Sequence, residues 1–131
     1  MSLTGTVLLV DSDKDVLNMN RASLELRRFS VYMALTFAEA QAHLKTITPD
    51  IVITEAYLPE GSGFDFGRGV IRQTDAYLFF LSAKAEPNDI SKAHDAGCDS
   101  YIAKPYAMER LMGQVEAVMR RRGWVGEAKR V

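Results

Sequence analysis

The sequence predicts an α/β domain in which a parallel sheet carries helices on both faces. Short apolar runs alternate along the chain with segments of helical length. Several of these runs are apolar on both sides, as strands buried between two layers of helices must be. Strands that alternate with helices imply parallel crossover connections, so the pattern is that of five βα units. The 131 residues fit one such domain and are enough to bury a core.

The predicted strands are runs of three to five residues. They are rich in β-branched or aromatic residues, which favour strands. The runs are Val7–Val10, Val31–Ala34, Ile51–Ile53, Tyr77–Leu81 and Tyr101–Ala103.

Helices are predicted after each of these runs. Thr36 followed by Glu39 forms a capping box, and Pro87 before Gly97 is the usual order of a helix start and a helix end. The third helix is the weakest, because glycine in a helix interior costs about 1 kcal/mol relative to alanine. The segments are Lys14–Arg28, Thr36–Pro49, Phe64–Arg72, Pro87–Gly97 and Met108–Arg122.

Apolar residues recur at helical spacing in the first and last of these segments. In the first, Val16, Met19, Ala22 and Leu26 are spaced by three or four residues, which predicts that they face the core. In the last, the predicted core residues are Leu111, Val115 and Val118.

Composition excludes several classes of protein. With 16 basic and 17 acidic side chains the net charge is −1, which supplies no overall field toward nucleic acid or a membrane. No apolar run approaches the roughly 20 residues of a membrane span. A single cysteine, Cys98, excludes an internal disulfide and favours a reducing, cytoplasmic location.

Polar residues follow four of the five predicted strands. Asp11 and Ser12 follow the first, Glu55 the third, Ser82 the fourth and Lys104 the fifth. Ligands of open α/β sheets bind at the carboxyl ends of the strands, so these side chains are expected to meet. Acids, a hydroxyl and a lysine suit a divalent cation and a phosphoryl group, with one carboxylate as the nucleophile.

The chain resembles the receiver domain of bacterial two-component response regulators. The motifs that carry the resemblance are VLLVDSD, PDIVITEAYLPEGSG, FFLSAKA and AGCDSYIAKPY. The resemblance implies a flavodoxin-like, doubly wound sheet of order 2-1-3-4-5 over residues 6–122. Residues 123–131 are then a C-terminal tail or the start of a linker, and the chain is either a stand-alone receiver or a piece of a longer protein.

The resemblance also implies roles for single residues. The acids after the first strand hold Mg²⁺, and the acid after the third strand accepts a phosphoryl group from a histidine kinase. Ser82 and Lys104 match the positions that sense this group, and Tyr101 matches the aromatic residue whose rotamer reports the active state. The Lys104–Pro105 bond matches a cis peptide of the family.

Two positions depart from the family pattern. The phosphoacceptor is normally aspartate and here is Glu55. The family usually has two adjacent acids after the first strand, whereas here Ser12 follows Asp11 and the next acid, Asp13, comes one residue later. The added methylene extends the side chain by roughly 1.5 Å, and a misplacement of about 1 Å can cost on the order of 100-fold in rate. We therefore expect a weakened or lost Mg²⁺ site and a receiver that is not phosphorylated in the ordinary way.

Several alternatives stay open at this stage. Glu55 is expected either to mimic the phosphorylated state or to pair with Lys104 in a resting state. A receiver that is still phosphorylated with Mg²⁺ is one alternative function. A phosphatase of the haloacid-dehalogenase type is a remote one, because the acids after Lys104 are only Glu109 and Glu116.

The expected partners are proteins. The resemblance implies binding of a histidine kinase or an output domain, or formation of a homodimer. The predicted surface consists of the helix from Pro87, the strand Tyr101–Ala103 and the last helix, with Tyr101 and Tyr106 on it. We expect no enzyme activity, no membrane contact and no direct nucleic-acid contact from this domain.

Overall fold

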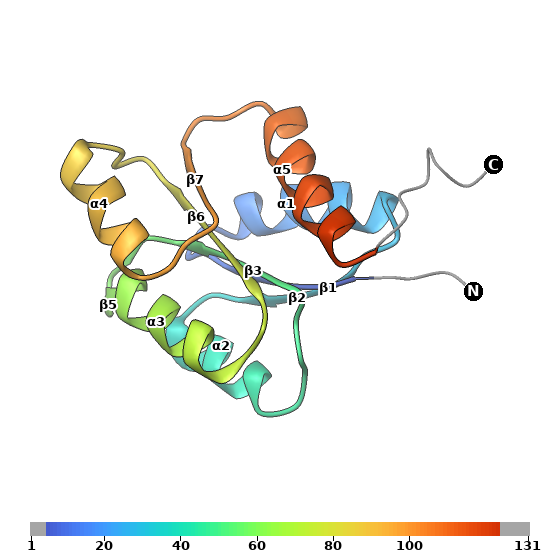
Figure 1. Ribbon diagram of the computed structural model, residues 1–131, viewed down its shortest axis with the longest axis horizontal. Helices are drawn as coiled ribbons and strands as arrows, with labels where there is room; N and C mark the ends of the chain where they lie inside the picture. The colour runs from blue at the N-terminus through green and yellow to red at the C-terminus, as the bar shows by residue number, and fades with distance from the viewer. Residues whose placement is uncertain (1–4, 124–131) are drawn as a thin grey trace.

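A five-stranded sheet forms the centre of the molecule, with helices on both of its faces (Figure 1). The computed structural model describes residues 5–123. The strands of the sheet are β1 (Thr6–Val10), β2 (Ser30–Ala34), β3 (Ile51–Glu55), β6 (Tyr77–Ser82) and β7 (Ser100–Ala103). They lie in the order β2-β1-β3-β6-β7, and every pairing in the sheet is parallel. The predicted fold and strand order are confirmed.

The helices divide the core into two layers. They are α1 (Lys14–Leu26), α2 (Phe37–Leu44), α3 (Gly63–Gln73), α4 (Pro87–Asp95) and α5 (Met108–Arg121). Side chains of α1 and α5 pack on one face of the sheet, while α2, α3 and α4 cover the other (Figure 1). Leu111, Val115 and Val118 of α5 are buried as predicted. Among the described residues, no helix combines the length and the apolar character needed to cross a membrane.

The inward face of α1 differs from the prediction. Leu17, Asn20 and Leu24 are its buried residues, whereas Met19 is 61% exposed and Leu26 is 74% exposed. The polar Asn20 lies in the middle of the buried stripe, where its Oδ1 accepts a hydrogen bond from the Tyr106 hydroxyl at 2.9 Å. Because this stripe contains a polar residue, the apolar periodicity pointed to the wrong face of the helix.

A short hairpin follows β3. β4 (Tyr57–Leu58) and β5 (Gly61–Ser62) pair in antiparallel fashion. Oε2 of Glu60, at the turn, accepts the backbone N–H of Phe37 at 2.8 Å and so links the hairpin to the start of α2.

Gly67, in the interior of α3, has a packing role that offsets its low helix propensity. A Cβ on Gly67 would lie 2.9 Å from a methyl carbon of Leu78 and 3.0 Å from the ring of Phe80. Glycine at this position therefore lets α3 approach β6 closely. The predicted C-terminal boundary is described only in part. Helix α5 ends at Arg121, and Gly123 has a φ of +87°. The rest of the predicted tail, from residue 124, lies outside the described residues.

Candidate functional site

The predicted site residues lie at one edge of the sheet. Asp11 directly follows β1, Glu55 ends β3, Ser82 ends β6 and Lys104 directly follows β7. The parallel register places the ends of these strands side by side, with Glu55 opposite Leu81 and Ser82 opposite Ala103. Three of the four side chains, those of Asp11, Glu55 and Lys104, come into direct contact.

Lys104 bridges the two acids. Its Nζ lies 2.7 Å from Oδ2 of Asp11 and 2.8 Å from Oε2 of Glu55. The three side chains are largely shielded, with exposed fractions of 20% for Lys104, 6% for Asp11 and 13% for Glu55. Burial alone would lower the pKa of the Lys104 ammonium, but its hydrogen bonds to Asp11 and Glu55 outweigh burial and raise that pKa above its ordinary value.

The other oxygens of both carboxylates accept backbone hydrogen bonds. Oε1 of Glu55 accepts the N–H of Ala56 at 2.9 Å and that of Tyr57 at 3.4 Å. Oδ1 of Asp11 accepts the N–H of Asp13 at 2.9 Å. Every carboxylate oxygen of the pair thus has a donor within the protein, as buried polar groups require.

Ser82 and Tyr101 belong to the β6–α4 side of the site. The Ser82 side chain is buried, and its Oγ accepts the N–H of Lys84 at 3.1 Å. The hydroxyl of Tyr101 donates to the backbone carbonyl of the same Lys84. Burial raises the pKa of Tyr101, which keeps its hydroxyl a donor. Lys84 therefore links the predicted sensor serine to the predicted aromatic reporter.

The residues that would hold Mg²⁺ do not fit that ion as they are placed. Mg²⁺ requires near-octahedral oxygen ligands at about 2.0–2.1 Å. Ser12 is exposed, and Oδ1 of Asp13 caps α1 by accepting the N–H groups of Asp15 and Val16. Among residues 5–123, no three histidine, cysteine or acidic side chains form a group that could hold a metal ion. The inward oxygens of Asp11 and Glu55 bind Lys104 instead.

The loop after Lys104 places Tyr106 against α1. The Lys104–Pro105 bond is cis, as the resemblance implies, and the Lys104 N–H donates to the Ser82 carbonyl at 2.8 Å. The Tyr106 hydroxyl, however, turns to Asn20 on α1. Tyr106 therefore packs on the side of the sheet that α1 and α5 cover, whereas Tyr101 packs on the α4 side.

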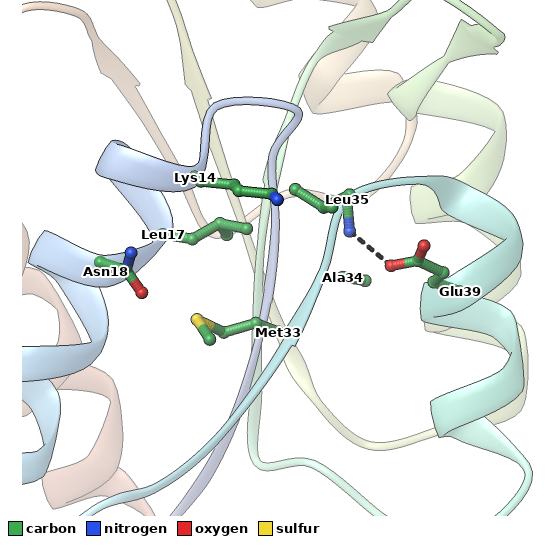
Figure 2. A pocket seen from close by; sticks show the side chains of 7 residues that line it. All are labelled: Lys14, Leu17, Asn18, Met33, Ala34, Leu35 and Glu39. Carbon is green, nitrogen blue, oxygen red and sulfur yellow. Dashed lines mark hydrogen bonds between the residues drawn. The ribbon is translucent and has the colours of Figure 1, made fainter.

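Two pockets flank α1. Figure 2 shows one of about 250 Å³, where the side chain of Lys14 extends toward Leu35 and the N–H of Leu35 donates to Glu39. None of the predicted site residues lines that pocket. The other, of about 370 Å³, lies beside the site, and its lining includes Lys104, Pro105 and the exposed Met19.

Sequence reasoning missed two residues near the site, Tyr57 and Asp89. The Tyr57 hydroxyl donates to Oδ1 of Asp89 at 2.5 Å, which joins the loop after Glu55 to the first turn of α4. This bond raises the pKa of Tyr57 to about 12 and lowers that of Asp89. The available signal was weak: a tyrosine two residues after Glu55 and an acid in the first turn of a predicted helix.

A family comparison agrees with this geometry. The model described as response regulator receiver domain matches residues 7–116. This chain belongs to that family. The phosphatase alternative has no support, because the acids that it would need after Lys104 lie away from the site. Glu109 is exposed, and Glu116 pairs with Arg27 at 3.2 Å, between α1 and α5.

Individual relatives of the receiver domain are longer proteins. The transcriptional regulatory protein KdpE of Mycobacterium tuberculosis is 34% identical over 115 residues, which cover 88% of this chain and 51% of that protein. PhoB of Pseudomonas aeruginosa, a phosphate regulon transcriptional regulatory protein, is 29% identical over 121 residues, covering 90% of this chain and 53% of that protein. The chain thus spans about half the length of the curated relatives it matches.

Solved structures share the fold. A two-component response regulator from Clostridium difficile superimposes with a TM-score of 0.88 and 26% identity, covering 91% of this chain and 98% of that one.

Proposed function

We propose that this receiver domain is degenerate and acts as a protein-interaction module in one fixed state. The observation that carries the proposal is the double ion pair of Lys104, whose Nζ contacts Asp11 at 2.7 Å and Glu55 at 2.8 Å. For phosphoryl transfer to Glu55, its carboxylate would have to leave one of its partners, and Lys104 would have to open its ion pairs to meet the incoming group.

Geometry argues against attack by Glu55. One of its oxygens is held by Lys104 and the other by the backbone of Ala56 and Tyr57. An attacking oxygen would have to leave one of these partners and still reach an in-line position. The longer glutamate side chain makes that alignment harder, because its carboxylate extends into the space that an aspartate would leave for the phosphoryl group.

Charge argues in the same direction. Asp11 and Glu55 carry two negative charges and Lys104 carries one positive charge, so the cluster is negative overall. A phosphoryl dianion would enter against that charge, and the ammonium of Lys104 is already paired with both acids. Ser12 is exposed and Asp13 caps α1, so neither supplies a ligand to this site. The remaining acids would hold Mg²⁺ weakly, because they would first have to leave Lys104.

The proposed partners are a histidine kinase or an output domain, bound through α4, β7 and α5. A receiver fold implies such a kinase, and the named relatives are transcriptional regulatory proteins of about twice this length. Tyr101 lies half-buried on β7, bonded to the loop before α4. Its fixed position would hold this surface in one shape for the partner or for a second copy of the chain.

Phosphoryl transfer from acetyl phosphate in Mg²⁺ tests the proposal. Intact-mass spectrometry would compare wild type, Glu55→Asp and Glu55→Asp/Ser12→Asp, with Glu55→Gln as the negative control. We expect no added phosphoryl group on the wild type and one on the double variant. A phosphoryl group on the wild type that is lost in Glu55→Gln would establish the alternative, a receiver that is still phosphorylated.

A further inference from the structure

We propose that Tyr57 is a positioning residue that couples the Glu55–Lys104 pair to the start of helix α4. The family roles of the site residues do not include this residue. The inference requires only that the Glu55 carboxylate is anchored where it lies, so it is independent of whether Glu55 ever accepts a phosphoryl group.

The first link joins the carboxylate of Glu55 to the backbone of the hairpin. Oε1 of Glu55 accepts the N–H of Ala56 at 2.9 Å and of Tyr57 at 3.4 Å. The carbonyl side of the same peptide is also fixed, because the Gly63 N–H donates to the Ala56 carbonyl at 2.7 Å. A change in the position of the Glu55 carboxylate therefore acts directly on the peptide from which the Tyr57 side chain projects.

The second link joins Tyr57 to α4. Its hydroxyl donates to Oδ1 of Asp89 at 2.5 Å, and Oδ2 of Asp89 accepts the N–H of Glu86 at 3.1 Å, just before the helix. A hydrogen bond to a carboxylate is about twice as strong as one between neutral groups. Asp89 thus connects the Tyr57 hydroxyl to the backbone that starts α4.

The third link joins the Tyr57 ring to Tyr101 through Lys84. Lys84 Nζ lies 4.8 Å from the centroid of the Tyr57 ring. The backbone of the same Lys84 donates to Ser82 and accepts the hydroxyl of Tyr101. On its other side the Tyr57 ring meets Phe64 edge-on, with ring centroids 5.4 Å apart. The ring is therefore held in a defined orientation between the hairpin, α3 and the β6–α4 loop.

Removing the Tyr57 hydroxyl alone should break the connection between Glu55 and α4, because that hydroxyl makes the bond to Asp89. Tyr57→Phe deletes the bond to Asp89 and keeps the ring that packs on Phe64, so the variant is expected to fold. Asp89→Asn weakens the same bond from the other side. Tyr32→Phe is the matched control, because it removes a tyrosine hydroxyl on β2, at the other edge of the sheet from β7.

Amide NMR spectra test the coupling. Glu55→Gln would be introduced into the wild type and into Tyr57→Phe, Asp89→Asn and Tyr32→Phe. In the wild type and in Tyr32→Phe we expect Glu55→Gln to shift the amides of α4 and Tyr101 as well as those near Lys104. In Tyr57→Phe and Asp89→Asn we expect the shifts near Lys104 to remain and those of α4 to be lost. Shifts of α4 that keep their size in Tyr57→Phe and Asp89→Asn would overturn the proposal.

Discussion

Lys104 contacts Glu55 through a 2.8 Å ion pair between Nζ and Oε2, at the edge of the sheet formed by the carboxyl ends of the strands. The same ammonium contacts Asp11 at 2.7 Å, so a side-chain cation lies between two acids. The longer side chain of glutamate makes this contact while its other oxygen still reaches the backbone N–H of Ala56.

Replacing Lys104 is expected to destabilise the domain. Lys104→Met removes the partner of two largely buried carboxylates, Asp11 and Glu55. Breaking a buried ion pair costs about 3–5 kcal/mol, and we expect about 2 kcal/mol here because the lysine is partly solvated. Urea unfolding measures the change, and Lys14→Met, which removes an exposed lysine at the start of α1, should leave the free energy of unfolding nearly unchanged.

The same comparison has a defined pH dependence. The folded-state pKa of Lys104 is raised above its ordinary 10.5, so its contribution to stability is fully present below that pH and is lost as pH rises through the folded value. The difference in unfolding free energy between wild type and Lys104→Met should thus be constant from neutral pH to about 10 and shrink above it. A difference that grows with alkaline pH would rule out the proposed pairing.

Gly63 is expected to tolerate no side chain. A Cβ at this position would lie 2.5 Å from the Glu55 carbonyl oxygen and 2.9 Å from that of Ala56, both of them backbone atoms. Gly63→Ala should therefore cost about 2 kcal/mol through overpacking and move the Glu55 backbone. Gly113→Ala on α5 is the control, since its added Cβ would meet no atom of the described residues within 4 Å beyond its chain neighbours and its own helix backbone. Alanine should stabilise that helix by about 0.5–1 kcal/mol. Equal effects of the two substitutions in urea unfolding would contradict this packing.

The hydrogen bond between Tyr57 and Asp89 should stabilise the domain only within a pH window. The raised pKa of Tyr57, about 12, gives a contribution that is complete below the ordinary value of 10.0 and is lost as pH rises through the folded value. The lowered pKa of Asp89 gives a contribution to stability that is complete above the ordinary pKa of 3.8 and is lost as pH falls through the folded-state pKa. Tyr57→Phe should therefore lower the thermal midpoint between about pH 4 and 10.

Outside that window the midpoints of wild type and Tyr57→Phe should converge. Tyr32→Phe serves again as the control and should show no such profile. A midpoint difference for Tyr57→Phe that does not change with pH would indicate lost packing rather than a lost hydrogen bond to Asp89.

Much of the fold could be predicted because its signals are local. The strands are continuous apolar runs, and α4 begins at Pro87 and ends before Gly97 as those residues indicate. Helix α1 shows the limit of such signals. Its buried face includes Asn20, whose partner Tyr106 is 86 residues away, so no apolar period marks that face.

The site could be predicted in part for a related reason. Parallel strands bring their carboxyl ends together, so the polar residues after β1, β3, β6 and β7 are expected to meet. Asp11, Glu55 and Lys104 do so, whereas the Ser82 hydroxyl accepts the N–H of Lys84. The bond between Tyr57 and Asp89 joins residues 32 positions apart, and it depends on the hairpin of β4 and β5. Gly63, directly after that hairpin, lies against the backbone of Glu55 and Ala56, and residue type alone does not reveal this contact.

Amide NMR with Mg²⁺ and beryllofluoride, which stands in for the phosphoryl group, tests the central claim most directly. The wild type would be compared with Glu55→Asp/Ser12→Asp under the same conditions. We predict that the amides of Ser82, Tyr101 and Lys104 do not shift in the wild type and do shift in the double variant. Shifts of these three amides in the wild type would contradict it, because the site would then still bind the phosphoryl mimic with Glu55 in place.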